Sequence, residues 1–355
     1  MITERLEKFR HSLAEKELDG ILISQPENRY YLSGFSGSAG YLLITQESTV
    51  LATDFRYFEQ VKEQAPDYEL FQIAGPLSEW FPQMIAELGT KRIGFESRDV
   101  THNLYRQLTE SLNKAESGLQ LIPTDGLVES IRAVKEPEEI ELITRAVEVT
   151  DKAFEYISET IRPGMTEKQV AWELEKFHRE NGCQSLAFEI IVASGPNSAL
   201  PHAKPTKRKI DSGEPIVIDM GGRVEGYCSD FTRTLCLGEP DDTFKKVYDT
   251  VLGAQLAAEA LIKSEMTGNE ADSFARIVIE EAGYAEAFGH SLGHGVGLAE
   301  HEEPRLGPNS EDTLLPGMVF SIEPGIYLPG WGGVRIEDLA VLEKDTLKVL
   351  TKGKK

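Results

Sequence analysis

The spacing of apolar residues along the first third of the chain predicts short helices that alternate with strands. Leu6, Phe9 and Leu13 recur at helical spacing within residues 2–16, and Gly20 follows as a stop signal. Further helices are expected at residues 56–63, 78–88 and 102–112. Strands are expected at residues 20–24, 41–45, 49–53, 69–73, 92–95 and 119–122, with a tight turn at 46–48 joining the second and third. This alternation predicts a mixed sheet covered by helices.

The pattern changes near residues 125–136, where long helices replace the short alternating elements. A charged helix is expected at residues 136–161 and a second helix at residues 165–181. A chain of 355 residues also favours two domains over one. We therefore place a first domain at residues 1–128 and a second at residues 129–355.

The second domain contains an internal repeat. The segment 164–182 resembles the segment 265–283, and in each a threonine, Thr166 or Thr267, stands sixteen residues before a glycine. Each half then supplies a histidine in an HxxP motif and two carboxylates in the same order: His202, Asp219 and Asp230, then His301, Glu323 and Glu337. A chance repeat would not keep acidic residues in register in both halves. We predict two helix–helix–strand units about a pseudo-twofold axis, with the carboxylates of both meeting at the centre.

These four carboxylates lie in, or directly beside, apolar runs that are typical of buried strands. A carboxylate buried without a partner is very costly, so such a group is paired or binds metal. An ordinary ion pair would explain any single one of them. A histidine between glycines, His294, lies in the segment 288–310, where the bare backbone can approach a ligand closely. Four carboxylates with this imidazole together favour a metal centre.

Such a ligand set suits two divalent cations. Oxygen ligands with one imidazole favour Mn²⁺, Co²⁺, Zn²⁺ or Fe²⁺ over copper. Two cations about 3.5–4 Å apart need bridging carboxylates, and the pair polarises a carbonyl and lowers the pKa of water. The sequence has no HExxH motif, and Cys183, Cys228 and Cys236 have no local nucleophile signature. We therefore expect hydrolysis without a protein nucleophile.

Two further histidines, His202 and His301, occupy matching positions of the repeat. A lone histidine is usually structural. Because these two are related by the repeat, they are better interpreted as hydrogen-bond donors to the substrate or the transition state.

Composition narrows the range of partners. The chain has 59 acidic and 37 basic residues and a formal charge of -22, which disfavours nucleic acid and anionic membranes, although solubility alone also explains an acidic surface. The N-terminal residues are charged and amphipathic, without an apolar signal core, and no run approaches the roughly 20 apolar residues of a spanning helix. Three cysteines without a CxxC motif fit a reduced cytoplasm.

The segment from about residue 136 to residue 350 resembles the pita-bread metallopeptidases, which include methionine aminopeptidase, aminopeptidase P and prolidase. The positions that match the dinuclear ligand pattern of that family are Asp219, Asp230, His294, Glu323 and Glu337. The resemblance implies that Asp230 and Glu337 bridge the metals. It implies that Asp219 completes one metal, that His294 and Glu323 complete the other, and that Glu323 shuttles a proton. The residues implied to surround the metals and bind substrate are His202, His290, His301 and Arg335.

The N-terminal domain resembles that of Xaa-Pro peptidases and creatinase. The fold implied is α/β, of the α+β type: a creatinase-like mixed-sheet domain at residues 1–128, then a pseudo-twofold pita-bread domain at residues 129–355. The implied cofactors are two divalent metal ions, Mn²⁺ first, with Co²⁺, Zn²⁺ or Fe²⁺ as alternatives. We expect a cytoplasmic homodimer that acts on proline-containing dipeptides or short peptides.

Within this group the motif HEEPR, ending at Arg305, resembles the HExPR of short microbial prolidases. Arg305 could form a bidentate pair with the carboxylate of a C-terminal proline, which favours an Xaa-Pro dipeptidase. An Xaa-Pro aminopeptidase, aminopeptidase P, is the alternative. A metal-free creatinase-type hydrolase and a non-catalytic pita-bread binding protein are further hypotheses, and both are disfavoured because all five ligand positions are present.

Overall fold

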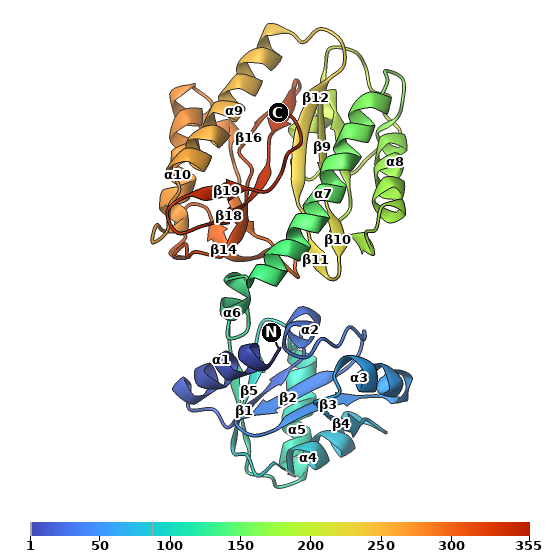
Figure 1. Ribbon diagram of the computed structural model, residues 1–355, viewed down its shortest axis with the longest axis vertical. Helices are drawn as coiled ribbons and strands as arrows, with labels where there is room; N and C mark the ends of the chain where they lie inside the picture. Colours follow the sequence, from blue (N-terminus) through green and yellow to red (C-terminus); the bar gives the residue numbers. More distant parts are fainter. Residues whose placement is uncertain (1, 87) are drawn as a thin grey trace. The chain divides into compact units, whose positions relative to one another are not determined.

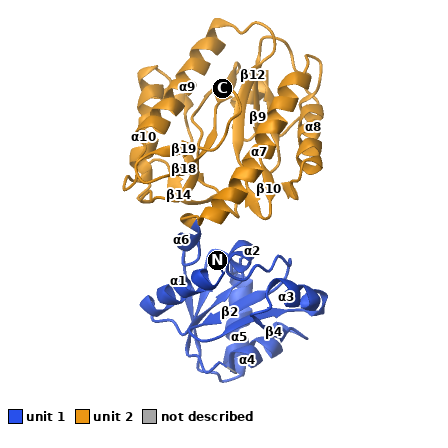
Figure 2. Cartoon of the chain, in the orientation of Figure 1, with its two compact units in different colours: residues 1–132 blue, residues 133–355 orange. Residues whose placement is uncertain are grey.

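A computed structural model describes residues 2–86 and 88–355 of the chain (Figure 1). The chain divides into two compact units, residues 1–132 and residues 133–355 (Figure 2). The division falls within the short helix α6 (Glu129–Ala133), whereas the boundary expected from the sequence lies directly before that helix.

The first unit is built on one six-stranded sheet with the strand order β4-β3-β2-β1-β5-β6. Its strands are β1 (Gly20–Ile23), β2 (Tyr41–Thr45), β3 (Thr49–Thr53), β4 (Glu69–Gln72), β5 (Arg92–Glu96) and β6 (Gln120–Thr124). Its helices are α1 (Ile2–Glu15), α2 (Pro26–Ser33), α3 (Phe58–Gln64), α4 (Leu77–Ala86) and α5 (His102–Lys114). β1 pairs with β5 in parallel and with β2 antiparallel. The predicted mixed sheet is therefore confirmed.

Local sequence signals account for most of these elements. The predicted hairpin is formed by β2 and β3, and its turn is closed by the Ser48 N–H, which donates to Thr45 Oγ1 at 2.8 Å. The helix expected at residues 56–63 is in part wrong, because it begins as a 3-10 turn (Phe55–Tyr57) before α3 starts. The helix expected at residues 78–88 corresponds to α4, and its residue 87 lies outside the described residues.

Helix α2 was not predicted, because its eight residues carry little hydrophobic periodicity. Pro26 starts the helix and Gly34 ends it with a φ of 75°, a left-handed conformation that glycine adopts without strain. The segment from Gly34 onward is a loop in the structure.

The second unit shows the predicted repeat in its helices. They are α7 (Pro137–Thr160), α8 (Glu167–Glu180), α9 (Asp242–Leu261) and α10 (Gly268–Glu281). Thr166 and Thr267 cap α8 and α10 in the same way. Each hydroxyl accepts from the backbone N–H three residues on, at 3.2 Å, in a capping box. The matching sequence segments therefore form matching helix starts.

The strands of the second unit form several small sheets. They are β7 (Ser185–Leu186), β8 (Ile191–Ser194), β9 (Pro215–Met220), β10 (Gly222–Val224), β11 (Tyr227–Cys228), β12 (Phe231–Cys236), β13 (Gly293–Gly295), β14 (Glu302–Leu306), β15 (Val319–Ile322), β16 (Gly325–Leu328), β17 (Gly332–Arg335), β18 (Asp338–Leu342) and β19 (Leu347–Val349). One sheet has the order β12-β9-β8 and another the order β14-β13-β15-β18-β19. In each, a central strand, β9 or β15, lies between two antiparallel neighbours.

Each half of this unit has its own apolar core. The first core joins α7 and α8 to β9 and includes Phe154, Leu174 and Ile218, all at most 4% exposed. The second joins α9 and α10 to β15 and includes Val251 and Phe320, both fully buried. The two helix pairs lie on opposite sides of the unit, with strands between them (Figure 1). The faces of β9 and β15 that do not pack against the helices can therefore carry the side chains of a functional site.

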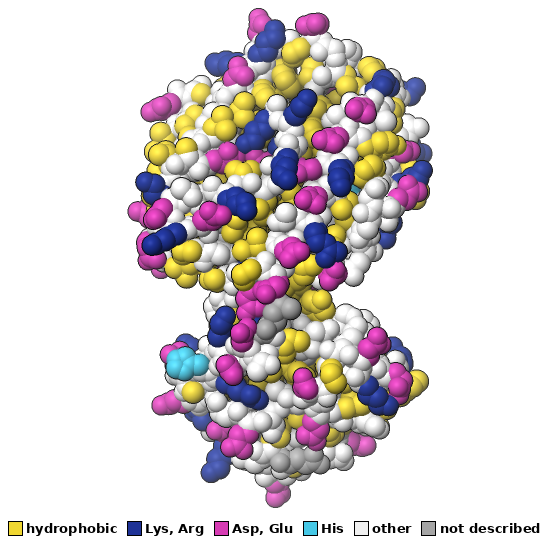
Figure 3. Space-filling view, in the orientation of Figure 1, with side chains coloured by type: hydrophobic (Ala, Val, Ile, Leu, Met, Phe, Trp, Pro, Cys, Tyr) yellow, Lys and Arg dark blue, Asp and Glu magenta, His cyan; other side chains and the backbone are white. Residues whose placement is uncertain are grey.

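The surface gives no sign of a single-charge interface on the face shown in Figure 3, where acidic and basic side chains are intermingled on both units. Among the helices of the described residues, none combines the length and apolarity needed to cross a bilayer.

Candidate metal centre

Strand alternation places the first two carboxylates. Side chains point to opposite faces of a strand in turn, and on β9 the fully buried Ile218 and Met220 face the core beneath α7 and α8. Asp219, which lies between them, therefore faces the other way. β12 runs antiparallel to β9 with Thr232 opposite Asp219, and Asp230 directly precedes β12. Asp230 lies two residues before Thr232, so both carboxylates leave the same face of this sheet.

The second half of the repeat places the other two carboxylates in the same manner. Glu323 directly follows β15, and Glu337 directly precedes β18. These strands are antiparallel, with Ile322 opposite Asp338, so the next pair across is Glu323 and Glu337. The pairing register therefore brings these two carboxylates side by side.

His294 reaches the centre because glycines flank it on β13. A Cβ on Gly293 would lie 2.0 Å from the carbonyl oxygen of Ser321, and one on Gly295 would lie 2.1 Å from that of Glu303. Neither position can hold a larger residue without moving the backbone of a neighbouring segment. The bare backbone noted in the sequence is therefore a packing requirement of the strands around His294.

The two halves meet directly at the carboxylates. The Glu337 N–H donates to the Thr232 carbonyl at 3.0 Å, and the Thr232 hydroxyl donates to Glu337 Oε2 at 2.7 Å. Asp230, His294 and Glu337 each present a ligand atom within 4.8 Å of those of the other two. His294 Nε2 also lies 3.3 Å from Glu323 Oε1 and 3.7 Å from Asp230 Oδ2. Four of the five predicted ligands therefore converge on one point.

Asp219, the fifth, has one oxygen held and one oxygen left over. Its Oδ2 accepts from Arg335 Nη2 at 2.6 Å. Its Oδ1 is buried, and no group among residues 2–86 and 88–355 forms a hydrogen bond with it. A buried polar atom without a partner calls for an explanation, and an oxygen that would bind a cation is one.

The electrostatics of the site also fit cations. Burial raises the pKa of Asp219, although Arg335 opposes the shift. Burial, followed by the repulsion from nearby carboxylates, raises the pKa values of Asp230 and Glu337 well above the ordinary range. Burial would raise the pKa of Glu323 too, but the hydrogen bond with His294 brings it to about 2.

The pKa of the His294 imidazole is shifted by the same carboxylates. Burial would lower the pKa of His294, yet the hydrogen bond and charge of Glu323 raise it to about 9. One imidazolium and the Arg335 guanidinium cannot offset four buried carboxylates, whereas two divalent cations can supply the missing positive charge. The donor set of hard oxygens with one imidazole therefore fits the implied metals, which these five residues would bind.

Two of the predicted substrate-binding residues, His290 and Arg335, lie in a hydrogen-bonded chain that ends on Asp219. His290 Nδ1 contacts the Ser291 carbonyl at 2.8 Å, so that nitrogen carries the proton and Nε2 accepts from the Tyr327 hydroxyl at 3.0 Å. The Tyr327 oxygen accepts in turn from Arg335 Nη1 at 2.8 Å. Burial lowers the pKa of His290, in keeping with a neutral ring. These contacts favour a role for Arg335 in positioning Asp219.

The other predicted residues border the ligands. The ring centroid of His301 lies 3.9 Å from that of His294, and burial together with the charge of His294 lowers the pKa of His301. Arg305 is opposite His294 in the β13–β14 register, so both side chains leave the same face of the sheet. Exposed His202 follows Pro201, whose carbonyl accepts from Arg335 at 3.2 Å.

One sequence pattern argues for a different chemistry and needs a structural answer. Residues 289–293, GHSLG, match the GxSxG pattern of serine hydrolases. That motif requires a turn from a strand into a helix with an exposed serine, whereas here it leads into strand β13. The Ser291 hydroxyl accepts from Arg305 Nε at 3.2 Å. The context of a serine nucleophile is therefore missing at this motif.

Three functional details escaped the sequence reasoning. Thr232, which joins the two halves, carries only the weak signal of standing two residues after Asp230. No motif marks Tyr327, yet its hydroxyl belongs to the hydrogen-bonded chain between Arg335 and His290. Tyr227 is 3% exposed and donates to Glu139 Oε1 at 2.8 Å.

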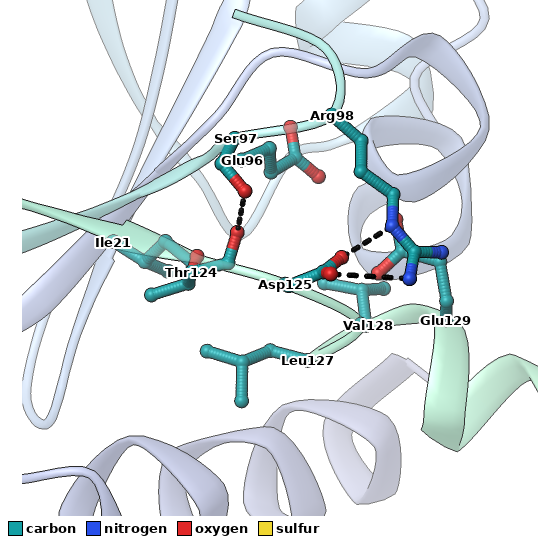
Figure 4. A pocket seen from close by; sticks show the side chains of 10 residues that line it. Ile21, Glu96, Ser97, Arg98, Thr124, Asp125, Leu127, Val128 and Glu129 are labelled. Carbon is teal, nitrogen blue, oxygen red and sulfur yellow. Dashed lines mark hydrogen bonds and ion pairs between the residues drawn. The ribbon is translucent and has the colours of Figure 1, made fainter.

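The first unit has a small pocket at the carboxyl ends of parallel strands β5 and β6 (Figure 4). Arg98 Nη2 donates to Asp125 Oδ2 at 3.1 Å, and the Ser97 hydroxyl donates to the Thr124 carbonyl at 2.8 Å. These polar groups are paired with one another across the pocket. The metal centre in the second unit is the stronger candidate.

Known proteins resemble this chain over its whole length. Residues 141–344 match the metallopeptidase family M24, and residues 5–134 match the creatinase/prolidase N-terminal domain. An Xaa-Pro dipeptidase of Pyrococcus horikoshii is 39% identical over 99% of this chain and 98% of its own. The structure of an Xaa-Pro dipeptidase from Bacillus anthracis is 43% identical, with a TM-score of 0.96, and covers 100% of this chain and 99% of that one. That of an X-Pro aminopeptidase from Thermotoga maritima is 39% identical, with a TM-score of 0.87, and covers 96% and 97%. With this match and the convergence of the predicted ligands, the chain belongs to the metallopeptidase family M24.

Proposed function

We propose that the protein hydrolyses Xaa-Pro peptide bonds at a dinuclear metal centre, and that it is an Xaa-Pro dipeptidase. The observation that carries the proposal is the convergence of Asp230, His294 and Glu337, with ligand atoms within 4.8 Å of one another, in a chain of family M24. Glu323 and Asp219 complete the ligand set. We take Mn²⁺ as the first candidate metal, followed by Co²⁺, Zn²⁺ and Fe²⁺.

The metal pair would polarise the scissile carbonyl and lower the pKa of water. Glu323 is the base in the proposal: it accepts from the Ser321 hydroxyl at 3.0 Å, which orients its carboxylate. It takes a proton from water and returns it to the leaving proline nitrogen. His301 and His202 donate hydrogen bonds to the substrate or to the charge that develops on its carbonyl oxygen.

Proline specificity follows from the kind of bond cleaved. A bond to proline has no N–H and a fixed φ, so the site must accept a tertiary amide. His290 contributes a neutral ring near the ligands, and Arg335 acts through Asp219 and Tyr327. Arg305 extends from the same face as His294 and would bind the carboxylate of a C-terminal proline. Relatives named Xaa-Pro dipeptidase support this assignment.

An Xaa-Pro aminopeptidase is the alternative. The likeness to the Thermotoga maritima X-Pro aminopeptidase supports it. So does the exposure of Arg305, whose contacts to Ser291 and Asp312 leave its guanidinium beside solvent. The hypotheses of a metal-free creatinase-type hydrolase and of a non-catalytic binding protein have less support. The site keeps all five proposed ligand residues and a buried oxygen of Asp219 without a hydrogen-bond partner among the described residues.

The remaining parts of the proposal concern partners and location. We expect proline-containing dipeptides or short peptides as substrates and a second copy of the chain as the partner, without nucleic acid or membrane. The three cysteines, Cys183, Cys228 and Cys236, are unpaired, which supports a cytoplasmic location.

The deciding experiment compares hydrolysis of Ala-Pro, its amide and Ala-Pro-Ala by the Mn²⁺-loaded protein. If Arg305 binds the terminal carboxylate, amidation of that carboxylate should lower kcat/KM. The loss should correspond to about 1.5–3 kcal/mol of activation free energy, the range for a hydrogen bond to a charged group. Arg305→Ala should erase that difference, Arg305→Lys should keep part of it, and Arg145→Ala, a change at an exposed arginine of α7, should leave it intact. Equal rates on Ala-Pro and Ala-Pro-Ala, unaffected by Arg305→Ala, would identify an aminopeptidase instead.

A further inference from the structure

Residues 351–355, here named the strap, pack against both halves of the second unit. They follow β19, and the Leu350 N–H donates to the Leu339 carbonyl at 2.8 Å. The Leu339 N–H donates in return to Thr351 Oγ1 at 3.1 Å. Thr351 is only 7% exposed and Gly353 is buried. The strap is thus an ordered part of the unit, beside strand β18.

The first half of the repeat binds the strap through α7 and β12. Asp151 on α7 accepts from the Gly353 N–H at 2.9 Å and from the Lys352 N–H at 3.0 Å. Gly353 lies against the ring of Phe231, where a Cβ would come within 2.6 Å of Cζ. A side chain at this position would therefore push the strap away from β12, the strand that starts directly after Asp230.

Arg233 connects the strap to a proposed metal ligand. Its side chain is 1% exposed, and its Nη2 donates to the Gly353 carbonyl and to Asp338 Oδ1, both at 2.7 Å. Its Nε donates to the Lys354 carbonyl at 3.1 Å. The same guanidinium donates through Nη1 to the carbonyl of Glu337. Arg233, a buried cation on β12, therefore connects that strand to the strap and to the start of β18.

The second half binds the strap through Lys355. Its Nζ lies 2.8 Å from Glu259 Oε1 on α9 and 2.6 Å from Asp338 Oδ2 at the start of β18. Asp338 is thus bound by Lys355 on one oxygen and by Arg233 on the other. Strands from opposite halves of the repeat are joined by the strap at the residues next to Asp230 and Glu337.

We infer that the strap is a positioning element of the metal centre, which sets the separation of Asp230 and Glu337 through Arg233, Asp338 and Lys355. The inference rests on the proposed ligand set. Two carboxylates that would hold the same cations must keep a narrow separation, and Asp230 and Glu337 come from different halves of the repeat. Substitution of a residue that supports a metal ligand through hydrogen bonds typically weakens metal affinity by about 10–100-fold.

The test titrates Mn²⁺ into metal-free full-length protein by calorimetry and counts bound ions. In Lys355→Met and in Gly353→Ala the Kd of the weaker site should rise by about 10–100-fold. Saturating Mn²⁺ should restore kcat, with KM unchanged, which a loss of folded protein would not do. Lys352→Met is the matched control, because its side chain is exposed and only its backbone N–H reaches Asp151.

The outcomes separate the strap from the ligand set. A wild-type protein that fails to bind two Mn²⁺ ions would overturn the proposed ligands and the strap with them. A wild-type protein with two sites, together with unchanged Kd values in both Lys355→Met and Gly353→Ala, would overturn the role of the strap alone. A loss of affinity in Lys352→Met equal to that in Lys355→Met would also overturn it, since the effect would then come from charge alone.

Discussion

A buried ion pair between Lys135 and Glu302 offers a sharp test of how the loop that carries His301 is supported. Lys135 Nζ lies 2.7 Å from Glu302 Oε1, and the side chains are 1% and 5% exposed. Lys135 follows the division between the two units, and its backbone N–H donates to the Gly317 carbonyl at 3.0 Å. The pair therefore links this segment to the residue directly after His301.

The expected cost of Lys135→Met follows from the burial. Methionine has a similar length but no charge, so the Glu302 carboxylate would remain inside without its cation. Breaking a buried pair by removing one partner costs about 3–5 kcal/mol, whereas replacing both partners with well-packed apolar groups is often neutral. We therefore expect Lys135→Met to be destabilising and Lys135→Met with Glu302→Met to recover most of the loss.

The assay is a double-variant cycle by urea denaturation of the metal-free protein, followed by circular dichroism. Wild type, both single variants and the double variant are compared at equal protein concentration, and the slope of the free energy against urea is checked in each. Lys204→Met is the control, since its pair with Glu189 is exposed and should contribute little to stability. A Lys135→Met cost no larger than that of the control would refute the reasoning.

Three other results are expected. Chelation should abolish hydrolysis and Mn²⁺ or Co²⁺ should restore it, while Asp230→Ala should bind at least one metal ion fewer; full activity at unchanged metal content would contradict the dinuclear centre. His202→Ala and His301→Ala should keep both metals and lose about 10²–10³-fold in kcat, the usual effect of removing one transition-state donor. Loss of metal in either variant would instead place that histidine among the ligands. Sedimentation should show a homodimer, and we expect the first unit of that dimer to limit substrate length. A monomer with the same selectivity for short peptides would contradict this expectation.

Most helices and the hairpin of the first unit could be predicted because their signals are local. The YLLIT and TVLAT runs became β2 and β3 with the expected bounds, since a short apolar run on each side of a short turn decides both. Helix α2 could not be found in this way, because its stability depends on packing of residues such as Tyr31 and Leu32 rather than on periodicity.

The proposed ligand set was within reach of the sequence for a different reason. A repeat that keeps one histidine and two carboxylates in register carries long-range information, because related halves fold alike and bring related positions to a common axis. Asp219, Asp230, Glu323 and Glu337 could thus be grouped without any structure. His294 needed the additional signal of its flanking glycines.

By itself, the sequence determined the two-part architecture, the repeat and the identity of the residues that meet at its centre. Only the tertiary structure decided which groups hold those residues in place: Thr232 between the halves, Arg335 on Asp219, and Arg233 between Glu337 and the strap. The physical reason is that hydrogen bonds and buried ion pairs depend on distances of a few tenths of an ångström between residues far apart in the chain. Residue type and spacing along the chain do not encode those distances, whereas they do encode which face of a strand each side chain leaves.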